Sequence, residues 1–368
     1  MMKFNLQNER IKKRYYEWLK ESGKGFSIST IDQVSRSVGL WEKYTKMQDF
    51  QRLNIETIKA FKKTLREKIN VITKRPLSLT TQHHYLIYIK DFYCWLSMQP
   101  RYKSKIILTD TSYFTLDRKQ TRMALNQPKK RVPTPEIIKK AVISIRIENE
   151  IDRRDQALMI FAFISGMRID AIISLPLGCV DIDKMLISQD THQGVRTKFS
   201  KDIPTTIFIF DENLVSIFKE WVRFLKEEKL FTDADPLFPR TKIEQESPDS
   251  YCFVADKFEC KFWKNANGAR NIFKKRFEMA GLEYFTPHSF RHTAVNTALS
   301  LCKTPSDFKA VSQNLGHKNI ATTMFDYASL PEDEVVKHVK NITSKGPADE
   351  GDIIKRLLQD YDIKPKNN

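Results

Sequence analysis

The segment from Thr286 to His292, TPHSFRH, carries the residues best suited to phosphate chemistry. Its Thr-Pro start is typical of a helix N-terminus, and it places His288 and Arg291, three residues apart, on one face of the first turns. A helix N-terminus that also presents an imidazole and a guanidinium is suited to holding a phosphate oxyanion. Taken alone, the pair is equally consistent with a surface His and Arg on a capped helix.

Two kinds of metal site are not favoured. His288 and His292 have the spacing of a zinc-binding helix, but Ser289 stands where that motif requires glutamate. No CxxC pair occurs among the five cysteines, which favours neither a zinc ribbon nor a disulfide framework: Cys94, Cys179, Cys252, Cys260 and Cys302. We therefore expect no metal ion and no cofactor.

Upstream of this segment, Arg168 and Lys198 could add cations to the same site. Arg168 follows an apolar helix and a glycine break, and the neighbouring Asp170 offers the alternative of a structural ion pair. Lys198 lies in a predicted β-hairpin over residues 195–201, with Lys201 as the alternative lysine. Either lysine could instead be an edge-strand charge that discourages aggregation.

Downstream, His317 and Tyr327 complete the set of candidate residues. Gly316 fits the position that ends a helix in a left-handed residue, which places His317 on the turn that follows. The alternative for His317 is a loop histidine that bonds the backbone, and the alternative for Tyr327 is a half-buried aromatic residue.

The elements that must position these residues are mainly helical. Residues 134–136, Thr-Pro-Glu, predict a helix start, and the apolar run 157–164 predicts a buried helix ahead of Arg168. Short strands are predicted afterwards, at residues 185–188, 195–198 and 205–210. The expected fold class is mainly α with a small β-sheet.

The charge of the chain is divided unevenly. It has 62 Lys and Arg against 45 Asp and Glu, a net charge of +17. Residues 1–131 hold 28 basic and 11 acidic residues and so carry the whole excess, while residues 132–368 hold 34 of each. A solvated basic surface is the ordinary explanation, but so one-sided a difference favours a module that binds a polyanion, with nucleic acid the first candidate.

Helical patterns fill this basic part. We expect a helix over residues 5–20, a second starting at Ser29, a third capped by Asn54 and a long one from Ser78 to about Pro100. Residues 101–134 are polar, basic and irregular, typical of an interdomain connection. The predicted organisation is a basic helical DNA-binding domain at 1–125, a linker at 126–134, a catalytic domain at 135–330 and a C-terminal tail at 331–368.

Nothing in the sequence indicates a membrane or secreted protein. The longest apolar stretch, residues 157–167, is shorter than a membrane span, and the N-terminus lacks the apolar region of a signal peptide. We expect a cytoplasmic, nucleoid-associated protein.

The candidate residues gain weight from their order. An arginine, a hairpin lysine, HxxR, LGH and a following tyrosine resemble the tyrosine recombinase (phage integrase) family, here as Arg168, Lys198, His288 with Arg291, His317 and Tyr327. Residues 26–100 resemble the family's helical, SAM-like core-binding domain. Two departures from the family pattern are Ala171, where an acidic residue is often found, and Tyr327, which is ten rather than nine residues after His317.

The resemblance implies a site-specific recombinase or integrase that cuts and rejoins DNA through a 3′-phosphotyrosyl intermediate, without metal or ATP, in the service of a mobile genetic element. It implies that Arg168 and Arg291 clamp the phosphate. It also implies that Lys198 or Lys201 is the general acid and that Tyr327 is the nucleophile. His288 would accept the tyrosine proton and His317 would bond the phosphate. The implied partners are double-stranded DNA with specific recombination sites, a homotetramer on two duplexes and an accessory directionality factor. The alternatives are a catalytically inactive architectural or regulatory DNA-binding protein of the same fold and a metal-dependent nuclease.

Overall fold

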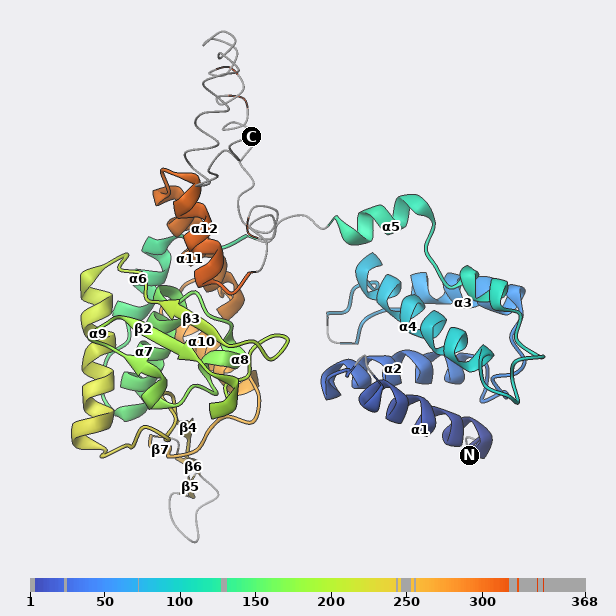
Figure 1. Ribbon diagram of the computed structural model, residues 1–368, viewed down its shortest axis with the longest axis horizontal. Helices are drawn as coiled ribbons and strands as arrows, with labels where there is room; N and C mark the ends of the chain where they lie inside the picture. Colours follow the sequence, from blue (N-terminus) through green and yellow to red (C-terminus); the bar gives the residue numbers. More distant parts are fainter. Residues whose placement is uncertain are drawn as a thin grey trace, which may run out of the picture. The chain divides into compact units, whose positions relative to one another are not determined.

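A computed structural model gives the fold of residues 4–22, 25–71, 73–126, 131–242, 244–245, 253–254 and 256–317, together with Thr323, Val336 and Lys340. The chain divides into two compact units, Met1–Lys129 and Lys130–Asn368 (Figure 1). Tyr327, residues 127–130 of the predicted linker and nearly all of the predicted tail lie outside the described residues. Within the described part, every helix is too short or too polar to cross a membrane.

The first unit is built of helices that begin at polar caps. They are α1 (Leu6–Glu21), α2 (Ile28–Tyr44), α3 (Ile55–Glu67), α4 (Leu79–Ser97), the 3-10 helix η1 (Leu108–Tyr113) and α5 (Arg118–Leu125). Asn54 and Ser78 cap α3 and α4 as predicted. The start of α2 differs from the prediction: Ser27, not Ser29, is the cap, and its hydroxyl accepts the backbone N–H of Thr30 at 3.3 Å.

Aromatic side chains fill the core of this unit. The Trp41 ring meets Phe61 and Phe114 edge to face, with ring centroids 5.1 and 5.0 Å apart, and its indole N–H donates to the Tyr93 hydroxyl at 2.7 Å. Burial raises the pKa of Tyr93. Residues 101–125 were expected to be irregular, yet they form η1 and α5 and bury Tyr102 and Phe114 in the core. The prediction was wrong because the apolar residues there occur in short consecutive groups, at 106–108, 113–114 and 123–125, and so show no helical period.

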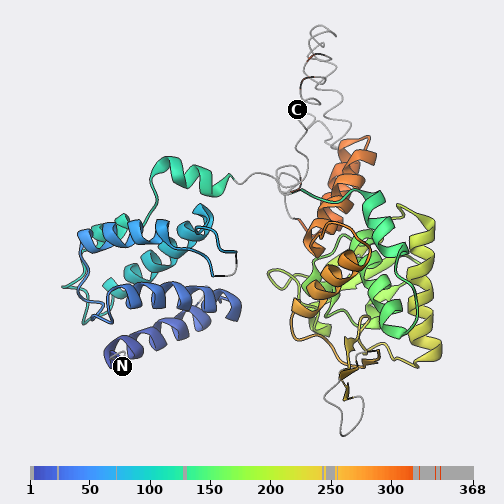
Figure 2. The ribbon, with the colours of Figure 1, turned by 180° about the vertical axis from the view of Figure 1, so that it is seen from behind.

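The second unit packs one face of a small sheet against a group of helices (Figures 1 and 2). Its helices are α6 (Pro135–Ile143), α7 (Glu150–Ile164), α8 (Ile169–Ile172), the 3-10 helix η2 (Leu177–Cys179), the 3-10 helix η3 (Thr191–Gln193), α9 (Glu212–Arg223), the π-helix η4 (Phe224–Glu228), α10 (Asn267–Met279), α11 (Pro287–Leu301) and α12 (Pro305–Asn314). The antiparallel sheet has the order β1 (Val180–Asp181), β2 (Leu186–Gln189), β3 (Ile203–Thr206). Two short pairs join β4 (Arg240–Thr241) to β7 (Phe258–Glu259) and β5 (Glu244–Gln245) to β6 (Phe253–Val254).

The expected fold class, mainly helical with a small sheet, is confirmed, but the strand positions are not all correct. The strand predicted at 185–188 is β2, one residue later, and that predicted at 205–210 begins at Ile203 and ends at Thr206. Residues 195–198 are not a strand. The Val195 N–H bonds the Asp190 carbonyl and the Arg196 N–H bonds the Ser174 hydroxyl, so this backbone is held without a ladder.

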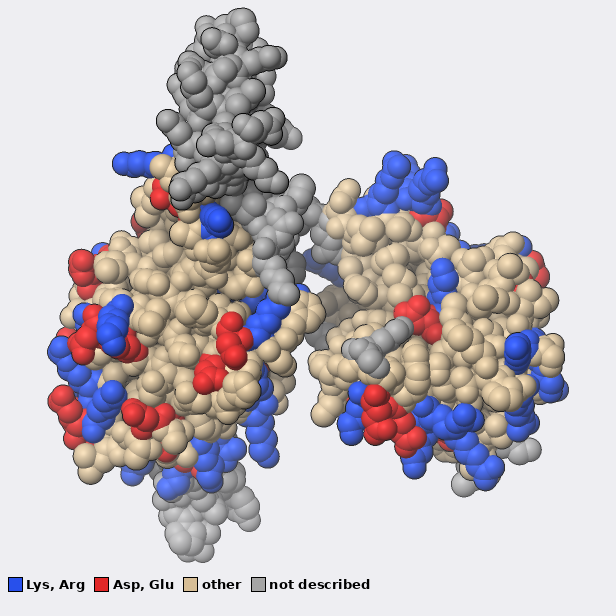
Figure 3. All heavy atoms as spheres, in the orientation of Figure 1, with Lys and Arg blue, Asp and Glu red and all other residues tan. Residues whose placement is uncertain are grey.

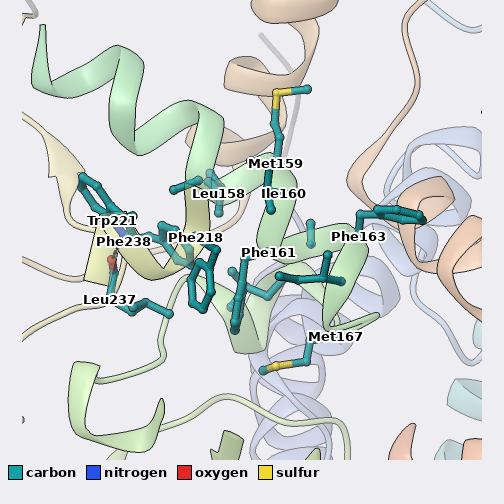
Figure 4. Packing of buried hydrophobic residues seen from close by; sticks show 14 of the residues in the cluster. Leu158, Met159, Ile160, Phe161, Phe163, Met167, Phe218, Trp221, Leu237 and Phe238 are labelled. Carbon is teal, nitrogen blue, oxygen red and sulfur yellow. Dashed lines mark hydrogen bonds between the residues drawn. The ribbon is translucent and has the colours of Figure 1, made fainter. Parts of the chain in front are cut away.

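Helix α7 is the centre of the second unit. Its residues from Ile151 to Ile164 are almost all buried, because α6, α9, α10 and α11 all pack against it. Figure 4 shows Phe161 of this helix facing Phe218 of α9, and their ring centroids are 4.7 Å apart. A helix enclosed on several sides is apolar on several faces, which explains the uninterrupted apolar run in the sequence.

A buried ion cluster fastens the first half of α7 to α10. Asp155 accepts from Arg154 Nη2 at 2.6 Å and from Arg276 Nε at 2.8 Å, and Arg276 Nη2 also donates to Asp152 at 2.7 Å. Burial opposes the charge of Arg276, but the two carboxylates outweigh it and raise the pKa of that guanidinium. All four side chains are buried, so each charge depends on the others for its stabilisation.

We expect Asp155→Ala to lower the free energy of unfolding of the second unit by about 3–5 kcal/mol, because it leaves two buried arginines without a shared carboxylate. Urea denaturation followed by tryptophan fluorescence measures the change. The control is Lys184→Ala, which removes the exposed ion pair with Asp181 and should leave the midpoint in place. Equal stability of Asp155→Ala and the unchanged protein would contradict this role.

Candidate active site

Arg291 lies at the meeting point of three segments of the second unit. The side chain is 2% exposed and extends from the second turn of α11. Its Nη1 donates to the Gly166 carbonyl at 2.5 Å, in the turn after α7, and its Nη2 donates to the Leu315 carbonyl at 3.3 Å, at the end of α12. Since the two carbonyls accept hydrogen bonds from different amino groups of the guanidinium, the cation has a fixed orientation.

His317 is joined to the same guanidinium and to a chain of hydroxyl groups. Its Nε2 is 3.3 Å from Arg291 Nη2, and its Nδ1 is 2.8 Å from Thr323 Oγ1, which donates to Ser312 Oγ at 3.0 Å. A guanidinium can only donate, so in this arrangement His317 Nε2 is the acceptor and the neutral ring carries its proton on Nδ1. The tautomer follows from its partners.

The turn that carries His317 requires a glycine. The Gly316 N–H bonds the Gln313 carbonyl and the His317 N–H bonds the Ser312 carbonyl, which is the Schellman pattern that ends a helix. Gly316 has φ +72°, and a Cβ there would lie 2.4 Å from the Ile203 side chain on β3. Both the backbone angle and the close approach to the sheet therefore exclude larger residues.

Arg168 lies two residues after the carbonyl that holds Arg291. It occupies the cap position of the short helix α8, and the fold leaves its side chain half-buried. The Arg291–Gly166 bond thus places the guanidinium of Arg291 against the turn that carries Arg168. Asp170 is exposed, and Ala171, which replaces the family's acidic residue, is buried.

His288 is exposed, whereas Arg291 one turn later is buried, so the two predicted residues of one helix face have different environments. His288 Nε2 is 3.2 Å from His292 Nε2, and the rings are nearly perpendicular at 84°. One ring must donate to the other, so His292 orients His288. Sequence reasoning considered His292 only for a metal role that it rejected; the i, i+4 spacing of the two histidines was the signal for this contact.

Lys198 and Lys201 lie on the loop between β2 and β3. Lys198 is exposed and Lys201 is half-buried. Their ammonium nitrogens are 5.0 and 5.6 Å from the centroid of the same ring, that of Phe199. The geometry keeps both lysines as alternatives for one role.

The base of this loop is tied to the rest of the site. The Ser174 hydroxyl, next to the end of α8, accepts the Arg196 N–H at 2.9 Å and donates to the Asp170 carbonyl at 2.8 Å. At the end of β3 farthest from the loop, the Asn314 side chain of α12 makes two hydrogen bonds to the Thr206 backbone, at 2.6 and 3.0 Å. The loop is therefore tied to the element that carries Arg168, and the strand that follows the loop is tied to the helix that precedes His317.

One group among the described residues has a metal-ligand composition: the ligand atoms of Asp190, His192 and Asp202 lie within 4.8 Å of one another at the neck of this loop. Asp202 already accepts the N–H and hydroxyl of Thr191, at 2.8 and 2.7 Å, and these bonds lower its pKa. Two protein donors thus already bond one carboxylate oxygen of Asp202, Oδ1.

The basic character of the first unit is visible at its surface. Figure 3 shows lysine and arginine side chains distributed over the visible face of this unit, with fewer acidic ones. On its helices, Lys43, Lys59 and Lys63 are exposed. Lys62 is half-buried, and burial followed by the nearby Arg66 lowers its pKa. These ammonium groups suit a polyanion because opposite charge relieves their mutual repulsion.

We expect Gly316→Ala to destabilise the second unit more than Gly194→Ala. Gly194 also has a left-handed φ, +85°, but no atom lies within 4 Å of the place that a Cβ would take there. Both variants carry the left-handed cost of about 1–2 kcal/mol, and only Gly316→Ala adds the collision with Ile203, about 1–3 kcal/mol more. Urea denaturation of both variants measures the difference; equal losses would show that the close approach has no energetic weight.

The second unit matches a known family, the phage integrase family, over residues 135–333. Among curated relatives, the chain is 23% identical to tyrosine recombinase XerC of Corynebacterium glutamicum over 170 residues, 46% of this chain and 45% of the relative. It is 26% identical to tyrosine recombinase XerD of Neisseria meningitidis serogroup B over 196 residues, 52% of this chain and 53% of the relative. The chain thus spans about half the length of these curated relatives.

Solved structures share the fold at low sequence identity. The Tn1549 transposon integrase in complex with transposon right end DNA aligns with a TM-score of 0.54 at 16% identity, covering 90% of this chain and 99% of that one. A lambda integrase dimer bound to a COC′ core site aligns with a TM-score of 0.59 at 11% identity, covering 86% and 93%. Since the family match extends over more than half of the sequence and includes every segment of the site, this chain belongs to the phage integrase family of tyrosine recombinases.

Proposed function

We propose that this protein is a site-specific DNA recombinase that cleaves and rejoins strands through a 3′-phosphotyrosyl intermediate. The observation that carries the proposal is the buried Arg291 guanidinium, which gathers the Arg168 turn and His317 around itself. An arginine held by two backbone carbonyls, a histidine bonded to it and a second arginine on the turn that it contacts form a cationic site, and a phosphodiester is the substrate that such a site fits. The family relationship supports the same reaction class.

In the proposed mechanism, the arginines bind the non-bridging oxygens of the scissile phosphate and offset the charge that grows in the transition state. Tyr327 attacks phosphorus, so that the tyrosine–phosphorus bond forms while the bond to the 5′ oxygen breaks. His288, oriented by His292, accepts the tyrosine proton, and a lysine of the β2–β3 loop gives a proton to the departing 5′ oxygen. Attack by another 5′-hydroxyl reverses these steps and rejoins the DNA.

The basic first unit supplies contacts to the DNA backbone in this proposal, so binding should weaken steeply with salt. Residues 132–368 carry no net charge. In this proposal the second unit therefore acts on one phosphate, and the first unit holds the duplex. A homotetramer on two duplexes and service to a mobile element belong to the same proposal; the transposon integrase that shares the fold supports the second of these.

We expect the protein to form an SDS-stable adduct with a nicked suicide substrate carrying its recombination site, in EDTA and without ATP, and Tyr327→Phe to abolish that adduct. The covalent bond requires the tyrosine oxygen, whereas DNA binding measured by mobility shift does not. Tyr284→Phe is the matched control and should retain the adduct. An adduct that persists in Tyr327→Phe would refute the assigned nucleophile. Binding without any adduct would favour the inactive architectural protein, and cleavage that requires a metal would favour a nuclease.

A substrate with sulfur in place of the bridging 5′ oxygen distinguishes the two lysines. A thiolate leaves without protonation, so removal of the general acid should slow cleavage of the oxygen substrate by about 10²-fold or more and leave the sulfur substrate nearly unaffected. We expect this pattern for Lys198→Ala, because its ammonium is the more exposed, and not for Lys201→Ala. The reverse pattern would assign the general-acid role to Lys201. If the sulfur substrate rescued neither variant, the general acid would not be a lysine of this loop.

A further inference from the structure

Phe199, at the tip of the β2–β3 loop, is a large apolar side chain held out in solvent. It is 76% exposed. Its φ is 64° and that of Ser200 is 46°, so two consecutive residues adopt the left-handed conformation that bulky L-residues rarely occupy. A conformation of this kind persists only where the surrounding structure imposes it, and it often accompanies a functional role.

The surrounding loop imposes this conformation through a closed turn. The Thr197 hydroxyl accepts the Lys201 N–H at 2.8 Å and donates to the Lys201 carbonyl at 2.6 Å. Below the turn, Val195 is buried and the Arg196 N–H is bonded to Ser174. The fold thus fixes both ends of a short projection whose largest side chain is Phe199.

Charge indicates what this projection contacts. The ammonium nitrogens of Lys198 and Lys201 lie 5.0 and 5.6 Å from the ring centroid, so two cations lie close to one aromatic ring. A nucleic acid strand offers the complementary pattern, with phosphates beside bases that stack on aromatic rings. An apolar protein surface would leave both ammonium groups desolvated without partners.

The distances also indicate where on the DNA the ring lies. A lysine that protonates the 5′ oxygen comes within about 3 Å of it. The Phe199 ring is then within about 9 Å of that oxygen, whichever lysine acts. This distance is at most two or three times the rise of one base step along a strand, about 3.4 Å.

We propose that Phe199 is a positioning residue that packs on the base of the first nucleotide on the 3′ side of the break, the nucleotide whose 5′ oxygen departs. This inference rests on the proposed recombinase function. The ring holds the departing 5′ end beside the lysine that protonates it, and it later keeps the 5′-hydroxyl in place for rejoining. Apolar wedges that contact bases in this manner are a known means by which proteins distort a duplex.

A cycle of protein and DNA changes tests the proposal. The rate of SDS-stable adduct formation is measured for the unchanged protein, Phe199→Ala and Phe199→Trp, on suicide substrates in which the first nucleotide on the 3′ side of the break is normal or abasic. We expect Phe199→Ala to slow cleavage of normal DNA about 10- to 100-fold and Phe199→Trp to retain most of the rate. The abasic change should slow the unchanged protein similarly and should not slow Phe199→Ala further, because the contact is already lost.

Leu230→Ala is the matched control, since Leu230 is 77% exposed with φ 54° and lies outside the loop; it should cleave at the unchanged rate. Phe199→Gly removes the ring and accepts the left-handed backbone, so it should be as slow as Phe199→Ala although it folds without strain. Unchanged rates in Phe199→Ala, or independent effects of the two changes, would overturn the role of Phe199 while leaving the recombinase function intact. No adduct with the unchanged protein would overturn the function itself.

Discussion

The hydrogen bond from Arg291 to the Gly166 carbonyl is the constraint on which the candidate site depends. It joins α11 to the turn after α7, and the second amino group of the same guanidinium reaches the end of α12. A buried guanidinium is costly unless its donors are satisfied, so the segments that provide its acceptors are held in register by the need to satisfy it. The same group that would neutralise a phosphate therefore organises the residues around that phosphate.

Around this centre, the fold uses side-chain to backbone bonds more than packing. Ser174 connects the end of α8 to the β2–β3 loop, and Asn314 connects α12 to β3. The arginine turn, the lysine loop and the histidine turn are thus linked in a ring of short bonds. Their relative positions are fixed although they come from segments separated by many residues, which is what a reaction on one phosphate requires.

Much of the helical framework could be predicted from sequence, because local signals decide it. Polar caps such as Asn54 and Thr134 mark helix starts by a bond within one turn, and Gly316 marks a helix end by its backbone angle. The order of the candidate residues indicated the family, which the match to residues 135–333 confirms. Loops were harder: residues 195–198 resemble a strand by composition but are held by contacts to Asp190 and Ser174 that no local pattern reveals.

The partners that complete the site could not be predicted for the same reason. Thr323 sets the tautomer of His317, and His292 orients His288. Both depend on the fold that brings them together. The individual roles of Lys198, Tyr327 and the other candidate residues remain proposals, since they depend on DNA contacts.

The two bonds from the Asn314 amide to the Thr206 backbone have a consequence for assembly. β3 is at the edge of its sheet, and the unpaired N–H and carbonyl of an edge strand can recruit a strand from another molecule. At Thr206 the asparagine side chain occupies both groups, as a neighbouring strand would. Copies of this protein are thereby prevented from extending one another's sheets at this point.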